Sequence, residues 1–159
     1  MARFFALFNI AVHDALQTSF TGKFDYGLWR PITAIRRADE DGNPNTAPDP
    51  NWSSLITTPP YPAYPGNQAA VSMAHATVFS LFFGRDDIAF QNTWEGIRTL
   101  GFTRSYPSFT AMANEVSEGR IYAGIHFRFE QTAGQTIGRD VANYVFQNFM
   151  TPRVTLSAQ

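Results

Sequence analysis

Residues 118–134 read EGRIYAGIHFRFEQTAG and bring Arg120, His126 and Glu130 into one short segment. Glu130 follows His126 by four residues, so on a helix its carboxylate could accept a ring N–H. That bond would fix the tautomer and leave the other ring nitrogen free to attack or to bind a metal. Arg120 lies six residues before His126, too far round an unbroken helix to share a ligand easily. The glycines of the segment therefore predict a break, with Arg120 in a connection and His126 in the first turns of the next helix.

A second string, KFDYGLWRP at residues 23–31, supplies Lys23 and Arg30. Together with Arg120 they give three cations and one imidazole, a set suited to a tetrahedral oxyanion such as phosphate or vanadate. The arginines can hold the oxyanion with forked hydrogen bonds, and His126 can bond to its central atom as nucleophile or metal ligand. The ordinary alternative for Lys23 and Arg30 is two surface cations.

Composition limits the class of protein. At 159 residues the chain is one domain that can bury a core. The net charge of −1 argues against a nucleic-acid binder, and the absence of cysteine excludes disulfides, thiol catalysis and zinc–thiolate sites. No apolar run reaches membrane-spanning length. Residues 1–12 could pass for a short signal peptide, but His13 and Asp14 follow at once, so we expect a buried first helix instead.

Apolar periodicity predicts an all-α helical bundle with a long proline-rich loop at residues 39–65 and no strand. The first helix is apolar on nearly all sides and should end at Gly22, and the second long helix should end at Gly84. Ser108 is a plausible cap for the helix that follows it. The helices are expected at residues 3–20, 28–38, 67–83, 86–100, 107–118, 125–130 and 134–149, the last with an apolar stripe at Ile137, Val141, Tyr144, Val145 and Phe149.

Three segments of the chain resemble the signature segments of the vanadium-dependent haloperoxidases. They are KFDYGLWRPITAIR at residues 23–36, TPPYPAYPGNQAAVS at 58–72 and the segment at 118–134, in matching order and spacing. This family shares a superfamily with the type 2 phosphatidic acid phosphatases and the bacterial class A acid phosphatases. Its members are longer, and their signatures lie in the C-terminal half. The resemblance implies that residues 1–159 form one haloperoxidase-like helical domain that lacks an upstream helical half.

The resemblance also implies roles for the site residues. In a haloperoxidase, vanadate would be bonded to His126 while Lys23, Arg30 and Arg120 neutralise its oxygens, and hydrogen peroxide would oxidise halide to hypohalous acid. In a phosphatase, the same His126 would attack the phosphorus of a phosphoester and form a phosphohistidine. The family usually has aspartate where this chain has Glu130, which is one methylene longer.

The middle signature departs from the family at residues 65–68. The family has Pro-Ser-Gly-His there, and this chain has Pro-Gly-Asn-Gln. Gly66 has no hydroxyl, but its backbone N–H remains available to an oxyanion. We expect Gly66 and Asn67 to be among the residues that bind the oxyanion. Gln68 stands where the family has the histidine that moves a proton, and an amide cannot exchange a proton near neutral pH. Losing a general acid lowers the rate by a factor of about 10²–10⁴. A catalytically silent domain that binds an oxyanion is therefore an alternative to the haloperoxidase and the phosphatase.

The sequence gives weaker indications of function for three other side chains. His75 lies about two turns beyond Gln68, roughly 10 Å along the helix, and is expected to be a partly buried helix histidine. Asp14 fits the family pattern and could pair with a site arginine, and Tyr61 occupies a loop position near the metal in haloperoxidases. The partners expected are small molecules (an oxyanion, with peroxide and halide or a phosphoester), and a second copy of the chain could cover the first helix. The compartment is left open, with the family favouring export.

Overall fold

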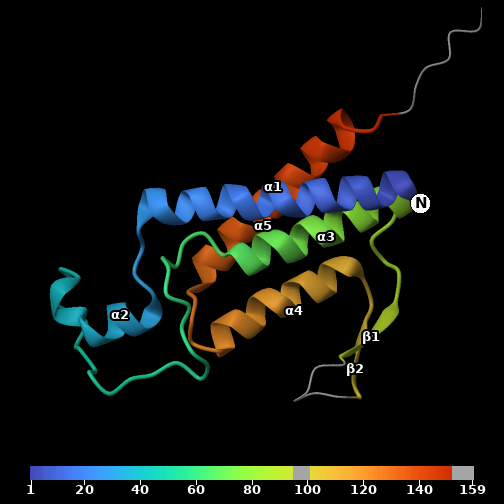
Figure 1. The fold of residues 1–159 in the computed structure, drawn as a ribbon. Coiled ribbons are helices and arrows are strands. Elements are labelled where there is room, and N and C mark those ends of the chain that lie inside the picture. Colours follow the sequence, from blue (N-terminus) through green and yellow to red (C-terminus); the bar gives the residue numbers. More distant parts are fainter. Residues whose placement is uncertain (95–100, 152–159) are drawn as a thin grey trace, which may run out of the picture.

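The computed structural model describes residues 1–94 and 101–151 and confirms an α-helical bundle with a long proline-rich loop. Helix α3 contacts each of the other long helices, and α1 also packs on α5 (Figure 1). The described elements are α1 (Ala2–Tyr26), α2 (Pro31–Arg36), the 3₁₀ turn η1 (Ala38–Glu40), α3 (Asn67–Phe83), β1 (Phe90–Trp94), β2 (Phe102–Tyr106), α4 (Phe109–Tyr122) and α5 (Arg128–Asn148). None of these helices has the length and apolarity needed to cross a membrane.

Helix α1 buries one face and exposes the other. Its buried residues recur at helical spacing and pack against α3 and α5, namely Phe4, Leu7, Ala11 and Ala15. The outer face exposes Phe5 and Phe24, at 57% and 70%. The expectation of a first helix buried on all sides is therefore wrong within the described chain. Helix α1 also runs past Gly22, which packs against Pro65, and ends at Gly27 with a left-handed φ of 58°.

Helices α3 and α5 approach through their backbones. A Cβ atom on Gly134 would lie 2.1 Å from the carbonyl oxygen of Gly66, and one on Gly138 would lie 2.1 Å from that of Ala70. The expected apolar stripe on α5 is thus only partly right, because Tyr144 is 62% exposed and small residues make the contact. This close packing sets the start of α5 against the start of α3.

A β-hairpin replaces the helix expected at residues 86–100. Strand β1 pairs antiparallel with β2, and Phe90 lies opposite Tyr106 with ring centroids 5.3 Å apart. The Phe90 ring also packs on Phe109 of α4, at 5.6 Å. Aromatic side chains that pack across two strands stabilise a hairpin, and here these contacts outweigh the weak helical pattern of the sequence. Residues 95–100 of that expected helix lie outside the described part of the chain.

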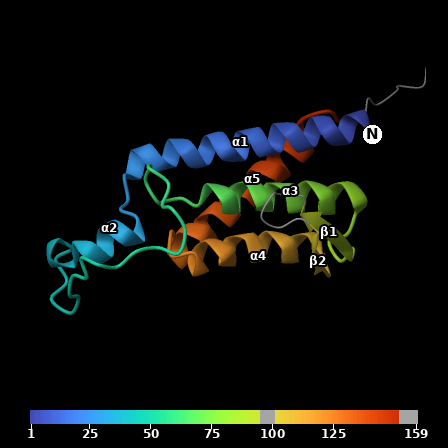
Figure 2. The same ribbon diagram turned by 60° about the horizontal axis from the view of Figure 1, so that its bottom comes forward.

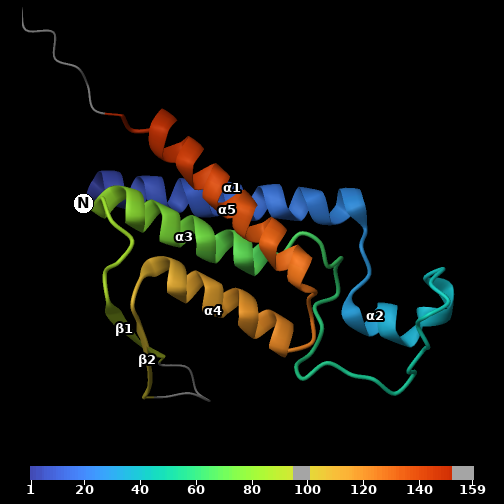
Figure 3. The same ribbon diagram turned by 180° about the vertical axis from the view of Figure 1, so that it is seen from behind.

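The proline-rich loop and α2 extend from the end of the bundle that lies opposite the N-terminus (Figures 2 and 3). Backbone hydrogen bonds tie this extension back to the bundle: the Leu55 N–H donates to the carbonyl of Ala123, and the Ala63 N–H to that of Leu28. The end of α1, the loop, the end of α4 and the start of α5 therefore meet at one end of the molecule.

Candidate oxyanion site

The break in the 118–134 segment falls at one glycine rather than two. Helix α4 continues through Gly119, so Arg120 lies in its last turn and not in a connection. Gly124 then takes a left-handed φ of 73° and turns the chain. His126 lies in this turn, just before α5, and not in the first turns of a helix as expected. This turn leaves His126 buried, at 3% exposed, with its imidazole beside Arg30.

Glu130 holds the imidazole of His126 from the first turn of α5. Its Oε2 lies 2.5 Å from Nδ1 of His126 and also accepts the backbone N–H of Phe127, at 3.2 Å. Both side chains are almost completely buried. The carboxylate thus caps α5 and orients the ring at the same time. The expected i, i+4 contact is present, with Nδ1 as the donor that leaves a lone pair on Nε2.

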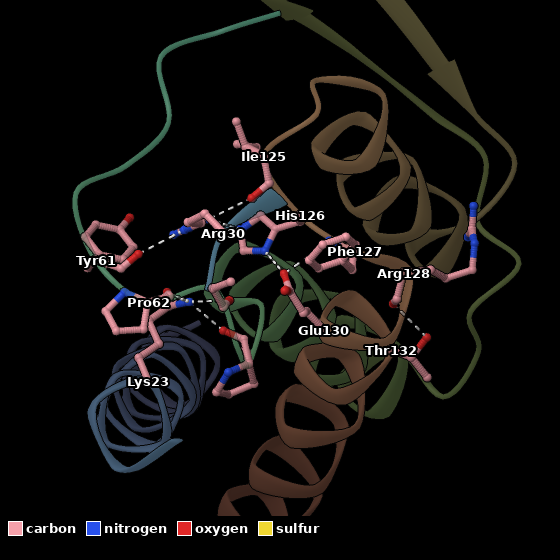
Figure 4. Close-up of polar contacts among 12 residues, drawn as sticks. Lys23, Arg30, Tyr61, Pro62, Ile125, His126, Phe127, Arg128, Glu130 and Thr132 are labelled. Atoms are coloured by element: carbon pink, nitrogen blue, oxygen red, sulfur yellow. Dashed lines mark hydrogen bonds and ion pairs between the residues drawn. The ribbon is translucent and has the colours of Figure 1, made fainter. Parts of the chain in front are cut away.

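Arg30 meets that lone pair directly. Its Nη1 lies 2.9 Å from Nε2 of His126 and also donates to the carbonyl of Ile125, while its Nε donates to the carbonyl of Tyr61 (Figure 4). A guanidinium can only donate, so Nε2 must be unprotonated. Burial lowers the pKa of His126, which agrees with a neutral ring. Arg30 is held at the start of α2, where Pro31 fixes the backbone.

Lys23 is fully buried in the last turns of α1. Its ammonium group donates to the carbonyls of Pro62, Ala63 and Pro65 at 3.0, 2.8 and 2.7 Å. Burial lowers its pKa to about 8, with the charge of Arg30 adding to the effect. Lys23 and Arg30 are therefore not surface cations. In this structure the lysine positions the loop, and all three of its protons are engaged.

Tyr61 covers the two buried cations. The Nζ of Lys23 lies 5.5 Å from its ring centroid, and the guanidinium of Arg30 lies 5.1 Å from it. A cavity of about 440 Å³, formed by residues from 27–33 and 58–62, opens beside Arg30 and Tyr61. Arg30 and Tyr61 therefore share the lining of this cavity.

Two donors of the site are buried without a partner. They are Nη2 of Arg30 and Nε of Arg120, neither of which is hydrogen-bonded within residues 1–94 and 101–151. The charge of Arg120 contributes to lowering the pKa of Arg30, and burial lowers the pKa of both. Free, buried guanidinium donors fit an anion with several oxygens. By contrast, the described residues hold no cluster of three acidic, His or Cys side chains that would suit a divalent cation.

Residues 65–68 contribute fewer groups to the candidate oxyanion site than the sequence predicts. The backbone N–H of Gly66 donates to the carbonyl of Glu130 at 2.9 Å, so in this structure it is already engaged, and its contact with an oxyanion stays a prediction. Asn67 is buried at the start of α3, and Gln68 beside it is exposed. Neither side chain makes a hydrogen bond to any described residue, and the structure shows no contact of Gln68 with His126. Their assignment to the site remains a prediction.

The remaining histidines lie elsewhere. His75 stacks on Phe8 with centroids 4.5 Å apart, between α3 and α1, and burial lowers its pKa. It is the partly buried helix histidine that the sequence predicts. His13 and Asp14 contact each other on the surface at 3.1 Å, and Asp14 pairs with no arginine in the described chain.

Gln131 is a buried neighbour of the site that no sequence pattern singles out. It is 2% exposed and lies against Gly66, where a Cβ atom would be 2.5 Å from its Nε2. The available signal was indirect: a polar residue directly after Glu130, at the start of a helix whose inner face is otherwise formed by small residues.

Comparisons with known proteins identify the family and agree with the helical fold. Residues 3–153 match the family model of the VCPO second helical-bundle domain. The vanadium chloroperoxidase of Curvularia inaequalis is 26% identical, over 86% of this chain and 29% of that protein. A bacterial vanadium-dependent iodoperoxidase superposes with a TM-score of 0.79 and 29% identity, over 92% of this chain and 33% of that one.

A holo-type bacterial vanadium-dependent chloroperoxidase shares the fold at a TM-score of 0.70 and 18% identity, over 89% of this chain and 34% of that one. The chain therefore spans about a third of the length of the relatives that it matches.

Proposed function

Since this chain belongs to the family of VCPO second helical-bundle domains, within the vanadium haloperoxidase superfamily, we propose that His126, Lys23, Arg30 and Arg120 form a vanadate site for the oxidation of halide by hydrogen peroxide. The observation that carries the proposal is the chain of contacts from Glu130 to Nδ1 and from Nε2 to Arg30. The Nε2 lone pair accepts a hydrogen bond from Arg30 in a buried place where electrostatic interactions are strong, and vanadate would have to displace that bond to reach Nε2.

The donors around His126 support an oxyanion with the shape of vanadate. Nη2 of Arg30 and Nε of Arg120 are buried and unpartnered within the described residues, and Lys23 adds a third positive charge. When bound, vanadate supplies a metal that activates peroxide as the oxidant. The protein's part would be to hold the oxyanion: Nε2 of His126, once released by Arg30, would bind the central atom, the cations would balance the charge on the oxygens, and Glu130 would keep the ring in one tautomer.

Phosphate has the same shape and charge type, so phosphoester hydrolysis through a phosphohistidine is the related alternative. The positions of Gln68 and His75 favour low turnover in either activity. Gln68 is exposed and cannot transfer a proton, and His75 is stacked in the core on Phe8. The second candidate is therefore a domain that binds the oxyanion and turns over slowly.

Orthovanadate binding measured by calorimetry tests the site. We expect the native protein to bind and His126→Ala to bind at least about tenfold more weakly, a loss of about 1.4 kcal/mol. The exposed His13 provides the control, and His13→Ala should bind like the native protein. A folded native protein that binds no orthovanadate would contradict the proposal.

Activity assays with bromide and peroxide, and with a phosphomonoester, then separate the two candidates. If the site is impaired at residue 68, Gln68→His should raise turnover by a factor of about ten or more while leaving orthovanadate affinity nearly unchanged. No change in turnover would show that the proton comes from another group.

A further inference from the structure

We propose that Gln131 is a further oxyanion-binding residue, whose side-chain amide provides the neutral hydrogen-bond donor of the site. The inference rests on the proposed oxyanion site and adds to it a residue for which neither spacing nor charge gives a signal. Three observations carry it: the burial of the amide, its contact with Gly66, and the adjacency in sequence of Gln131 to Glu130 and of Gly66 to Pro65.

The amide of Gln131 is buried with its hydrogen-bonding capacity unused. The residue is 2% exposed, and neither Nε2 nor Oε1 has a partner within the part of the chain that the structure describes. Burying such a group unpaired costs about 1–3 kcal/mol. An unbranched apolar side chain would fill the same space without that cost, so the amide indicates a polar ligand.

Gly66 and Gln131 share one space. A Cβ atom on Gly66 would lie 2.5 Å from Nε2 and 3.0 Å from Cδ of Gln131, so a side chain at residue 66 would require the amide to move. The backbone N–H of Gly66 is already bonded to the carbonyl of Glu130. The amide of Gln131 is therefore the polar group that occupies the place of a residue-66 side chain, at the loop expected to line the oxyanion.

Gln131 and Gly66 are each next in sequence to a residue that fixes a group of the site. Gln131 follows Glu130, whose Oε2 orients His126 and whose Oε1 is also unpartnered among the described residues. Gly66 follows Pro65, whose carbonyl accepts a hydrogen bond from the ammonium group of Lys23 at 2.7 Å. An Nε2–H donor here adds a directional contact to an oxyanion without adding charge, and Oε1 can accept from a protonated oxygen of the same ligand.

The test compares Gln131→Met with Gln147→Met. Methionine keeps the length of the side chain and removes both hydrogen-bonding atoms, and Gln147 is an exposed residue of the same helix. We expect Gln131→Met to bind orthovanadate at least tenfold more weakly with an equal or higher melting temperature, because an unpaired buried amide is gone. Gln147→Met should match the native protein in both measurements.

A second pair of variants tests the shared space. Gly66→Ser alone should lower the melting temperature, because its Cβ would meet the amide of Gln131. Adding Gln131→Ala should restore the melting temperature and return part of the affinity through the new hydroxyl.

Orthovanadate binding by Gln131→Met within twofold of the native value would show a space-filling amide and overturn this inference, while the proposed function stands. A native protein that binds no orthovanadate overturns both.

Discussion

At the residue scale, the ammonium group of Lys23 is a buried charge held by the proline-rich loop. It is buried, it contacts three carbonyls of the 62–65 segment, and its pKa is lowered to about 8. These contacts hold the loop in place before any ligand arrives. A positive charge kept inside the protein at neutral pH carries a cost in stability, which the three carbonyls offset only in part.

That cost predicts a pH dependence. The folded protein releases the Lys23 proton near pH 8 and the unfolded chain near the ordinary value of 10.5, so between these values the unfolded chain binds more protons. The free energy of unfolding should therefore rise with pH across this window because of Lys23. Urea unfolding of the native protein and of Lys23→Met, at pH 7.5 and pH 10, measures the effect. The difference between them should move in favour of the native protein at pH 10, and an unchanged difference would refute the assignment.

The contacts of single residues also show what a sequence can and cannot predict. The pairing of His126 with Glu130 follows from a spacing of four residues near a helix start, which is local information. The loss of the Gly66 N–H to the carbonyl of Glu130 and the burial of Gln131 depend on how two distant helices pack. No local pattern encodes that packing, so these features had to come from the structure.

At the scale of elements, the α3–α5 contact determines where the site residues lie. Gly134 and Gly138 allow the two backbones to touch, which places Glu130 beside Gly66. The sequence predicts the long helices because their apolar residues recur over several turns. The sequence does not predict the hairpin, because Phe90 contacts Tyr106 across the strands and Phe109 on α4, and these contacts leave no periodic pattern.

A matched pair of substitutions tests this contact. In Gly134→Ala the new Cβ atom would lie 2.1 Å from the carbonyl oxygen of Gly66, so we expect a loss of about 3 kcal/mol in the free energy of unfolding. Gly119→Ala is the control, since its Cβ atom would have no other atom within 4 Å on the surface of α4. That change should stabilise the protein by about 0.5–1 kcal/mol, because alanine favours the helix. Equal effects of the two substitutions on urea unfolding would contradict the close approach.

At the scale of the whole molecule, helix α1 exposes aromatic side chains near both of its ends. Phe5, Phe24 and Tyr26 are 57%, 70% and 71% exposed, and the chain spans about a third of the length of its relatives. We therefore expect this surface to be covered by further polypeptide, either another domain or a second copy of the chain.

Self-association of the isolated chain follows from this surface. Size-exclusion chromatography at rising concentration should show species larger than a monomer, because exposed aromatic side chains gain by leaving water. The variant Phe5→Ser/Phe24→Ser should shift the equilibrium toward monomer with little change in melting temperature, since both side chains are largely exposed in the folded chain. A clean monomer at all concentrations would count against an uncovered face.

The hydrogen bond between Arg30 and His126 also has a consequence for biosynthesis. It joins residues 96 positions apart, whereas the contacts of Lys23 with its loop span 39 to 42 positions. A chain that leaves the ribosome from its N-terminus can close the lysine loop before the imidazole has been synthesised. The segment at 118–134 then finds the loop and one guanidinium already in position, so the nascent chain can complete this site only after that segment has left the ribosome.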